Sequence, residues 1–280
     1  METMRVSRFS VRVITLTLIS CLTSLAQSTP PPVIGKFVGV WVEDTAKLKI
    51  GGSMANLTFR QTTGGGLEEL RGSELKPLVQ TVKFDGKSYS IDESKNTIAW
   101  KQIDSSHFER RIFDEGKLLN IRRIQISSDG KTLTQVTETN LPSGKKDVST
   151  VTFLRTSGGP QGLVGVWKPQ SVKTNRPTEM RFEPSGTGGV KLTFETGVNY
   201  TSNLDNVPVV VNGPAVISGT MIAFRAIDDH TLESTSSRQG VVTGKTTLSV
   251  SNDGKTMTST TTSIGPEGNR EPSVSVFEKR

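Results

Sequence analysis

Cysteine is almost absent from this 280-residue chain, in which Cys21 is the only one. Without a second thiol the chain cannot form an internal disulfide, so its stability has to come from a hydrophobic core. The same shortage excludes a cysteine-rich metal site. It also excludes a cysteine nucleophile if Cys21 is removed with the N-terminus.

Other residues that carry chemistry are scarce as well. There are two histidines, His107 and His230, and no loop of clustered Asp, Glu and Asn with calcium spacing. The triplet Asp228-Asp229-His230 is predicted to be a turn between strands. No G-x-S-x-G nucleophile elbow is present, and Gly240–Thr246 is one residue short of a phosphate-binding loop. We therefore expect no metal, no cofactor and no enzymatic activity.

Aromatic residues are few, and the charges are nearly balanced. The chain has 11 Phe, three Trp and two Tyr, and 34 basic residues against 27 acidic ones. A membrane β-barrel made by both halves together would need aromatic girdles, and a nucleic-acid-binding face would need concentrated basic residues interleaved with aromatics. The composition therefore argues against an outer-membrane barrel and against a nucleic-acid partner.

The one long apolar run lies at the N-terminus. Three arginines precede Val13–Leu22, and Ser24-Leu25-Ala26 follows it, which is the layout of a secretory signal peptide. The run is shorter than the roughly 20 residues that a membrane-spanning helix needs. We therefore expect residues 1–26 to be cleaved, which leaves no transmembrane segment in the mature chain and places it in the periplasm or outside the cell.

A second interpretation of this region is a lipid anchor. Leu18-Ile19-Ser20-Cys21 resembles a bacterial lipobox, which would place a lipid on Cys21. Leu22 and Leu25 continue the apolar stretch past the cysteine, so ordinary cleavage is favoured.

The rest of the chain is a duplication. Gly39-Val40-Trp41 recurs as Gly165-Val166-Trp167, 126 residues later, and Asp129–Thr134 recurs as Asp253–Thr258, 124 residues later. Chance similarity would not hold one register over such distances, so the chain contains two copies of one unit. The predicted organisation is a Pro-rich linker over 27–35, a first unit over 36–156, a Gly-rich linker over 157–163 and a second unit over 164–280.

Each unit is predicted to be all-β. Stretches such as Val190–Glu195 alternate apolar and polar residues with a period of two, and Asp-Gly or Asn-Gly pairs suited to tight hairpins separate them. A short helix fits at most near Asp44 to Ile50. The pattern favours two tandem antiparallel meander β-barrels of about eight strands each, because closure leaves no open edge strand. A two-sheet sandwich is the alternative.

One stretch of the first unit changes phase. In Leu119–Ile126 the apolar positions shift from odd to even numbers across Arg122-Arg123, which predicts a β-bulge at the two arginines and places Glu109 opposite Arg122. The steps Arg110-Arg111 and Arg122-Arg123 are interpreted as surface charge. The alternative is an anionic ligand held at the barrel mouth. The second unit has Thr246 and Thr247 in place of Arg122 and Arg123.

The Gly-x-Trp opening, the hairpin meander and a basic residue near the end of each unit resemble the lipocalin-like, or calycin, barrels. In that family the Trp lies at the base of the barrel and a basic residue of the closing strand packs across it. The resemblance implies a structural latch of Trp41 with Arg155 and of Trp167 with Lys279, each worth about 0.5–2 kcal/mol as a cation–π contact.

The tandem arrangement behind a signal peptide further resembles uncharacterised secreted lipocalin-like proteins of bacteria. It implies a non-enzymatic exported protein that can hold a small apolar or amphipathic molecule inside one or both barrels. The alternative is a structural or protein-interaction module of the cell envelope with filled barrel interiors. Fold-level analogy supports both, and neither has assigned ligand-binding residues.

Overall fold

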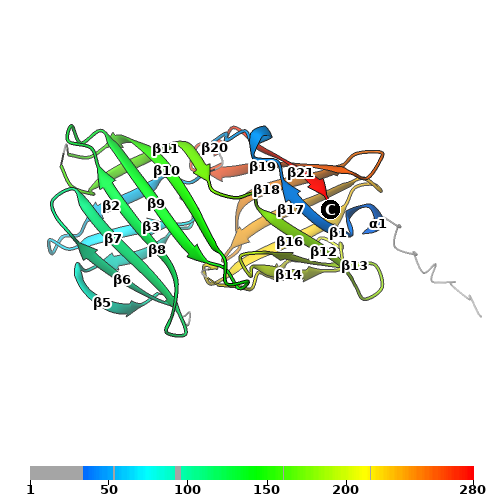
Figure 1. The fold of residues 1–280 in the computed structure, drawn as a ribbon, viewed down its shortest axis with the longest axis horizontal. Helices are drawn as coiled ribbons and strands as arrows, with labels where there is room; N and C mark the ends of the chain where they lie inside the picture. Colours follow the sequence, from blue (N-terminus) through cyan, green and yellow to red (C-terminus); the bar gives the residue numbers. More distant parts are fainter. Residues whose placement is uncertain (1–33, 53, 92–95, 160, 215) are drawn as a thin grey trace, which may run out of the picture.

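The computed structural model describes residues 34–280 except residues 53, 92–95, 160 and 215 (Figure 1). The expected signal peptide over 1–26, the candidate lipid site at Cys21 and most of the expected linker over 27–35 lie outside the described residues. In the described part, helix is limited to α1 (Ile34–Phe37) and the 3-10 turn η1 (Thr45–Lys47). The turn falls within the stretch predicted for a short helix, whereas α1 was not predicted.

The predicted all-β fold of two barrel-like units is confirmed. The strands form two curled antiparallel sheets, which lie side by side along the long axis of the molecule (Figure 1). The sheets have ten and eleven strands, more than the eight predicted. We call the ten-stranded sheet the first barrel and the eleven-stranded sheet the second barrel.

The first barrel has the strand order β4-β3-β2-β11-β10-β9-β8-β7-β6-β5. Within the described residues, its end strands β4 and β5 do not pair with each other, although only Lys83 and Phe84 separate them in the chain. Its strands are β2 (Leu57–Gln61), β3 (Leu67–Arg71), β4 (Leu78–Val82), β5 (Asp85–Ser90), β6 (Asn96–Gln102), β7 (His107–Asp114), β8 (Lys117–Ile126), β9 (Thr132–Asn140), β10 (Lys146–Ser157) and β11 (Gly165–Thr174).

The second barrel has the order β14-β13-β12-β1-β21-β19-β18-β17-β16-β15, with β20 paired to β19. Its two ends meet, because Asn199 and Asn212 exchange backbone hydrogen bonds of 2.8 and 2.9 Å. Its strands are β1 (Gly39–Glu43), β12 (Glu179–Ser185), β13 (Gly189–Phe194), β14 (Asn199–Ser202), β15 (Val209–Val210), β16 (Thr220–Ala226), β17 (Thr231–Arg238), β18 (Val241–Val250), β19 (Thr256–Gly265), β20 (Gly268–Asn269) and β21 (Ser273–Lys279).

The hairpin turns follow the sequence signals closely. Glu115 and Gly116 both have positive φ, 48° and 81°, as a two-residue hairpin turn requires. The duplicated Asp-Gly turns are built alike: the Asp129 carboxylate accepts from Ser127 Oγ at 2.7 Å, and the Asp253 carboxylate accepts from Ser251 Oγ at 2.6 Å. These local contacts explain why the meander could be predicted from the sequence.

The two units exchange their opening strands. β1 pairs with β12 and β21 of the second unit, and β11 pairs with β2 and β10 of the first (Figure 1). The sheets therefore consist of residues 57–174 in one case and of 39–43 with 179–279 in the other, so they do not coincide with the sequence units 36–156 and 164–280. In the chain, the first barrel is inserted between β1 and β12, the first two strands of the second barrel. The strand of the first barrel that corresponds to β1 is β11, which comes last in its sequence, so the first barrel is a circularly permuted unit.

The connection between β10 and β11 gives a physical reason for the exchange. Only seven residues separate the end of β10 from the start of β11, so β11 returns directly beside β10, which is the least costly closure in chain entropy. The strands approach closely there, because a Cβ on Gly165 would lie 2.2 Å from the Ser157 carbonyl oxygen. β1 then occupies the equivalent place in the second barrel.

Each barrel has its own hydrophobic core. The first core surrounds Trp100 and Trp167, and the second surrounds Trp41 and Phe224. Phe37 of α1 is fully buried in the second core, so the short helix covers the end of that barrel.

Polar contacts join the barrels. Arg238 Nη1 donates to the Lys76 carbonyl oxygen at 2.7 Å, and Arg270 forms an ion pair with Glu74. Arg270 Nη1 also donates to the carbonyl oxygen of Met54 at 3.2 Å. Loops of both barrels are therefore tied together at their junction.

Candidate functional site

The residues predicted to form the barrel latches are all in latch positions, but their partners are exchanged. The Arg155 guanidinium lies 4.0 Å from the ring centroid of Trp167, and the Lys279 ammonium lies 5.1 Å from that of Trp41. The predicted pairs of Trp41 with Arg155 and of Trp167 with Lys279 are therefore wrong. The reason is the strand exchange, which places each Trp beside the closing strand of the other unit.

The latches also explain the glycine of Gly-Val-Trp. Gly39 has a φ of 133°, which residues with a Cβ rarely adopt, and a Cβ there would lie 2.8 Å from Lys279 Cε, so glycine suits the place where the lysine chain passes over the Trp41 ring. Arg155 donates to the carbonyl oxygens of Gly130, Gly162 and Val164 at 2.7 Å each, and burial lowers the pKa of its guanidinium. Its hydrogen-bonding groups face the backbone, which makes the latch a structural element.

A charged cluster lies inside the first barrel, and no prediction identified it. Arg110 on β7 and Glu69 on β3 are each 1% exposed. Their strands are not neighbours in the sheet, so the side chains meet across the barrel interior. Arg110 Nη1 lies 3.0 and 3.2 Å from the two oxygens of Glu69, and Arg122 Nη1 of β8 lies 3.4 Å from one of them. We call these three residues the interior cluster.

The interior cluster holds a surplus of positive charge. Burial by itself raises the pKa of the Glu69 carboxyl, but the guanidiniums of Arg110, Arg122 and Arg71 together outweigh it and hold that pKa below its ordinary value. Burial lowers the pKa of Arg122 to about 10, and burial together with the Arg122 charge lowers the pKa of Arg110. Because arginine stays protonated in proteins, the three groups carry one net positive charge at neutral pH.

Several buried polar atoms on strands β6 to β9, which include the arginines of the interior cluster, have no hydrogen-bond partner among the described residues. They include the donors Trp100 Nε1, Arg110 Nε and Arg122 Nε, and the acceptors Asn120 Oδ1 and Gln135 Oε1. Each buried polar group without a partner costs about 1–3 kcal/mol. Unpaired polar groups that lower stability are expected at functional sites.

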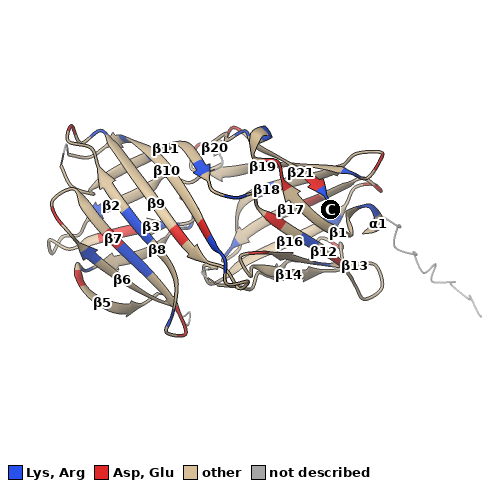
Figure 2. Ribbon diagram, viewed as in Figure 1, with Lys and Arg blue, Asp and Glu red and all other residues tan. Residues whose placement is uncertain are grey.

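The two double-arginine steps each place one arginine inside the barrel and one outside. Cross-strand pairing sets Arg110 opposite Arg122, while Glu109 lies opposite Arg123. Arg111 and Arg123 are on the outer face, where Arg111 pairs with Glu109 and Arg123 with Glu138. Basic and acidic residues accordingly lie on neighbouring strands in Figure 2.

The predicted position of the β-bulge is wrong, and this error hid the inward arginines. The register shift falls between Ile112 and Phe113 and leaves Leu119 as the extra residue, so Arg122 and Arg123 remain in regular pairing. Arg122 consequently shares the inner face with Ile124. The second barrel has the same bulge, with Thr243 as the extra residue, which makes the bulge part of the duplicated scaffold.

The cluster itself is not duplicated. The pairs Phe59–Glu69, Trp100–Arg110 and Arg110–Arg122 of the first barrel correspond to Phe182–Leu192, Phe224–Ser234 and Ser234–Thr246 of the second. The second barrel thus has leucine, serine and threonine where the first has its three charges. This difference between the two units is the one signal in the sequence that indicates the cluster.

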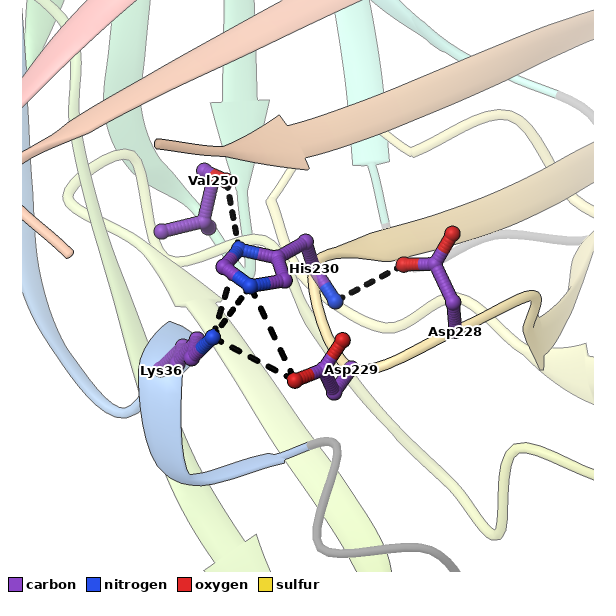
Figure 3. A network of polar contacts seen from close by, with 5 residues as sticks. All are labelled: Lys36, Asp228, Asp229, His230 and Val250. Atoms are coloured by element: carbon purple, nitrogen blue, oxygen red, sulfur yellow. Dashed lines mark hydrogen bonds and ion pairs between the residues drawn. The ribbon is translucent and has the colours of Figure 1, made fainter. Parts of the chain in front are cut away.

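The histidines lie at the beginning of equivalent strands but in different surroundings: His107 is the first residue of β7, and His230 directly precedes β17. His107 Nδ1 lies 2.9 Å from the Asp104 carboxylate, on the surface of the first barrel. His230 instead contacts Lys36 of α1 and the Val250 carbonyl oxygen, the latter at 3.0 Å from Nδ1 (Figure 3). Asp228 accepts from the His230 backbone N–H at 2.8 Å, as a turn residue does.

Neither histidine belongs to a metal centre that the structure reveals. Among residues 34–280 with the stated gaps, no group of three or more His, Cys, Asp or Glu side chains is arranged to hold a metal ion. In the same part of the chain, no helix combines the length and apolar character needed to cross a membrane.

Comparison of the chain with protein-family models, with curated proteins and with solved structures finds no match. The interior cluster is therefore the feature of the chain that bears most directly on its function.

Proposed function

We propose that this chain is an exported, non-enzymatic binding protein of lipocalin-like type, whose first barrel holds a small amphipathic molecule with an anionic head group. The observation that carries the proposal is the interior cluster with its surplus positive charge. Export is supported by the signal-peptide layout of the sequence.

The duplicated scaffold supports a role beyond folding for the interior cluster. The second barrel forms the same strands around Leu192, Ser234 and Thr246. Burying ions is costly, and apolar residues of similar volume are often neutral or stabilising in their place. Charges retained at these positions in one barrel alone are therefore better explained by a ligand than by the fold.

The charge of the cluster favours an anion. Two guanidiniums face a single carboxylate in a site of low polarity, where electrostatic interactions are strong. An anionic group beside Arg122 would balance the charge and could accept from donors such as Arg110 Nε and Trp100 Nε1. The surrounding apolar side chains, including Phe59, Ile98 and Ile124, suit an apolar ligand body.

The three residues of the interior cluster differ in solvent exposure, and this difference supports access of a ligand to the cluster. Glu69 and Arg110 are closed off from solvent, whereas the Arg122 side chain is 20% exposed. The first barrel is also the more open one, since its end strands β4 and β5 are unpaired with each other within the described chain. Arg122 therefore offers a ligand its first charged contact.

The test is native mass spectrometry of the protein purified from its own host, followed by titration with amphiphiles that differ only in an anionic, neutral or cationic head. We expect a co-purifying molecule and preferential binding of the anionic amphiphile. Arg122→Gln is expected to weaken that binding at least about tenfold, since a charge-assisted hydrogen bond is worth roughly 1.5–3 kcal/mol. Arg123→Gln, its outward neighbour, is the matched control.

The alternative is a structural or interaction module with filled interiors. It is favoured by the second barrel, whose core positions hold Tyr200 and Phe224 in ring contact at 5.5 Å. Absence of a co-purifying molecule together with equal affinity of the unaltered protein for all three amphiphiles would support this alternative and overturn the binding proposal.

A further inference from the structure

A pocket of about 270 Å³ opens where the second barrel meets the first. Strands β17, β18 and β19 form one wall, and the first barrel contributes the loop from Gly72 to Glu74. Six of the thirteen lining residues carry a hydroxyl, and the lining surface is more apolar than polar; the six are Ser73, Ser236, Thr243, Thr246, Thr261 and Ser263.

One residue of this pocket, Thr246, takes the place of a charged residue of the first barrel. Thr246 corresponds to Arg122, because Ser234 faces Thr246 as Arg110 faces Arg122. A threonine is shorter than an arginine and uncharged. Where the first barrel has the Arg122 guanidinium, the second barrel therefore has open space with the Thr246 hydroxyl at its wall.

The lining of the pocket combines hydroxyl groups with three charged side chains, Arg270, Glu74 and Lys245. Thr246 Oγ1 and Thr261 Oγ1 lie 3.0 Å apart, and Thr243 Oγ1 donates to the Ser236 carbonyl oxygen at 3.3 Å. Arg270 and Glu74 line the pocket as an ion pair that compensates its own charges. Lys245 adds one ammonium, on an exposed residue.

We infer that this pocket binds a small, uncharged polyhydroxylated molecule of about monosaccharide size. A hydroxyl can donate and accept, so these side chains match the alcohol groups of such a molecule better than they match an ion. The paired Arg270 and Glu74 add one fixed donor and one fixed acceptor. The volume is just below the roughly 300–1,000 Å³ typical of ligand pockets, which limits the ligand to a small molecule. This site is independent of the interior cluster.

The test is titration of the full-length protein with glucose, galactose, mannitol, myo-inositol and inorganic phosphate, followed by NMR chemical shifts. We expect saturable shifts with at least one sugar or polyol and weaker binding of phosphate. Thr246→Val and Thr261→Val keep the side-chain shape and remove a hydroxyl, so each is expected to raise Kd at least about fivefold. Thr247→Val, the neighbour of Thr246 that does not line the pocket, should leave Kd unchanged within about twofold, the range of a lost surface contact.

Three outcomes overturn the inference: no saturable binding of any sugar or polyol, tighter binding of phosphate than of every polyol, or equal effects of Thr246→Val and Thr247→Val. If both pocket threonine variants fail to fold, Ser236→Ala removes a different pocket hydroxyl, and an unchanged Kd in that variant overturns the inference as well.

Discussion

The two barrels share a scaffold and differ in what fills it. Both have the same Asp-Gly turns, the same bulge and a Trp covered by a cation. The first barrel places Glu69, Arg110 and Arg122 in its interior, whereas the second places Leu192, Ser234 and Thr246 at the same positions. The comparison separates the residues that the fold requires from those that it merely accommodates.

The largest expected effect tests the strand exchange. Trp41 and Trp167 are both fully buried, and truncation of a buried Trp to Ala costs roughly 3–5 kcal/mol in free energy of unfolding. Because Trp41 lies in the second barrel, Trp41→Ala should lower amide protection in residues 179–279, and Trp167→Ala should lower it in 57–154. Hydrogen exchange read by mass spectrometry measures both, and the reverse assignment would show that the strands are not exchanged.

The interior cluster provides the next effect. Glu69→Gln leaves two buried guanidiniums without their carboxylate, which is expected to cost roughly 3–5 kcal/mol in free energy of unfolding. Glu68→Gln on the same strand removes the ion pair with partly exposed Arg60 and should cost less than about 1 kcal/mol. Urea unfolding measures both variants.

A triple variant sharpens this result. Glu69→Leu with Arg110→Met and Arg122→Met removes all three charges at similar volume, as the second barrel does by other means. It is expected to be more stable than Glu69→Gln, since an apolar replacement avoids the unpaired charge. A triple variant less stable than the single one would mean that the cluster holds the first barrel together.

The two latches should differ in strength. Arg155 contacts Trp167 and donates three hydrogen bonds to backbone carbonyls, whereas Lys279 contacts Trp41 and donates one, to the Lys36 carbonyl oxygen at 2.9 Å. With about 1 kcal/mol per hydrogen bond, Arg155→Met is expected to cost roughly 2 kcal/mol more than Lys279→Met. Thermal unfolding of the pair checks this, and equal losses would contradict it.

Acidification is expected to produce the smallest difference between the barrels. The pKa of Glu69 is lowered in the folded chain, so its contribution to stability is present above its unfolded value of 4.5 and is lost as pH falls through the folded pKa. Burial raises the pKa of Glu195 in the second barrel, so its contribution is present below 4.5 and is lost as pH rises through the folded pKa.

The first barrel should therefore lose stability relative to the second as pH falls from 7 to 3. Hydrogen exchange at a series of pH values, corrected for the intrinsic exchange rate, measures each barrel separately. Glu69→Gln should remove most of the difference, and a pH dependence that persists in this variant would contradict the assignment to Glu69.

Local patterns made the architecture predictable. Period-two alternation and the Asp-Gly turns act between residues close in the chain, so they fixed the all-β class, the hairpins and the duplication. The phase change in Leu119–Ile126 predicted a bulge in the correct strand but placed it at Arg122-Arg123 instead of Leu119. A bulge placed three residues too far along the strand predicts that Arg122 faces outward, whereas it faces the barrel interior. The sequence therefore did not predict the candidate site.

The contacts that the sequence could not assign join residues far apart in the chain. Glu69 meets Arg110 across the barrel, and Thr246 shares a pocket with Glu74 of the other barrel. No periodicity or residue spacing in one of these stretches indicates that it contacts the other. Such pairs become visible only when the curvature of the sheet and the contact between the barrels are known.

The sequence by itself determined two copies of an antiparallel β unit, each opened by Gly-Val-Trp and closed by a basic residue. It could not determine which copy of that strand enters which barrel, because both copies begin with the same Gly-Val-Trp triplet. The tertiary structure decided this through the short connection after β10, which returns β11 beside its chain neighbour and leaves the equivalent place in the second barrel to β1.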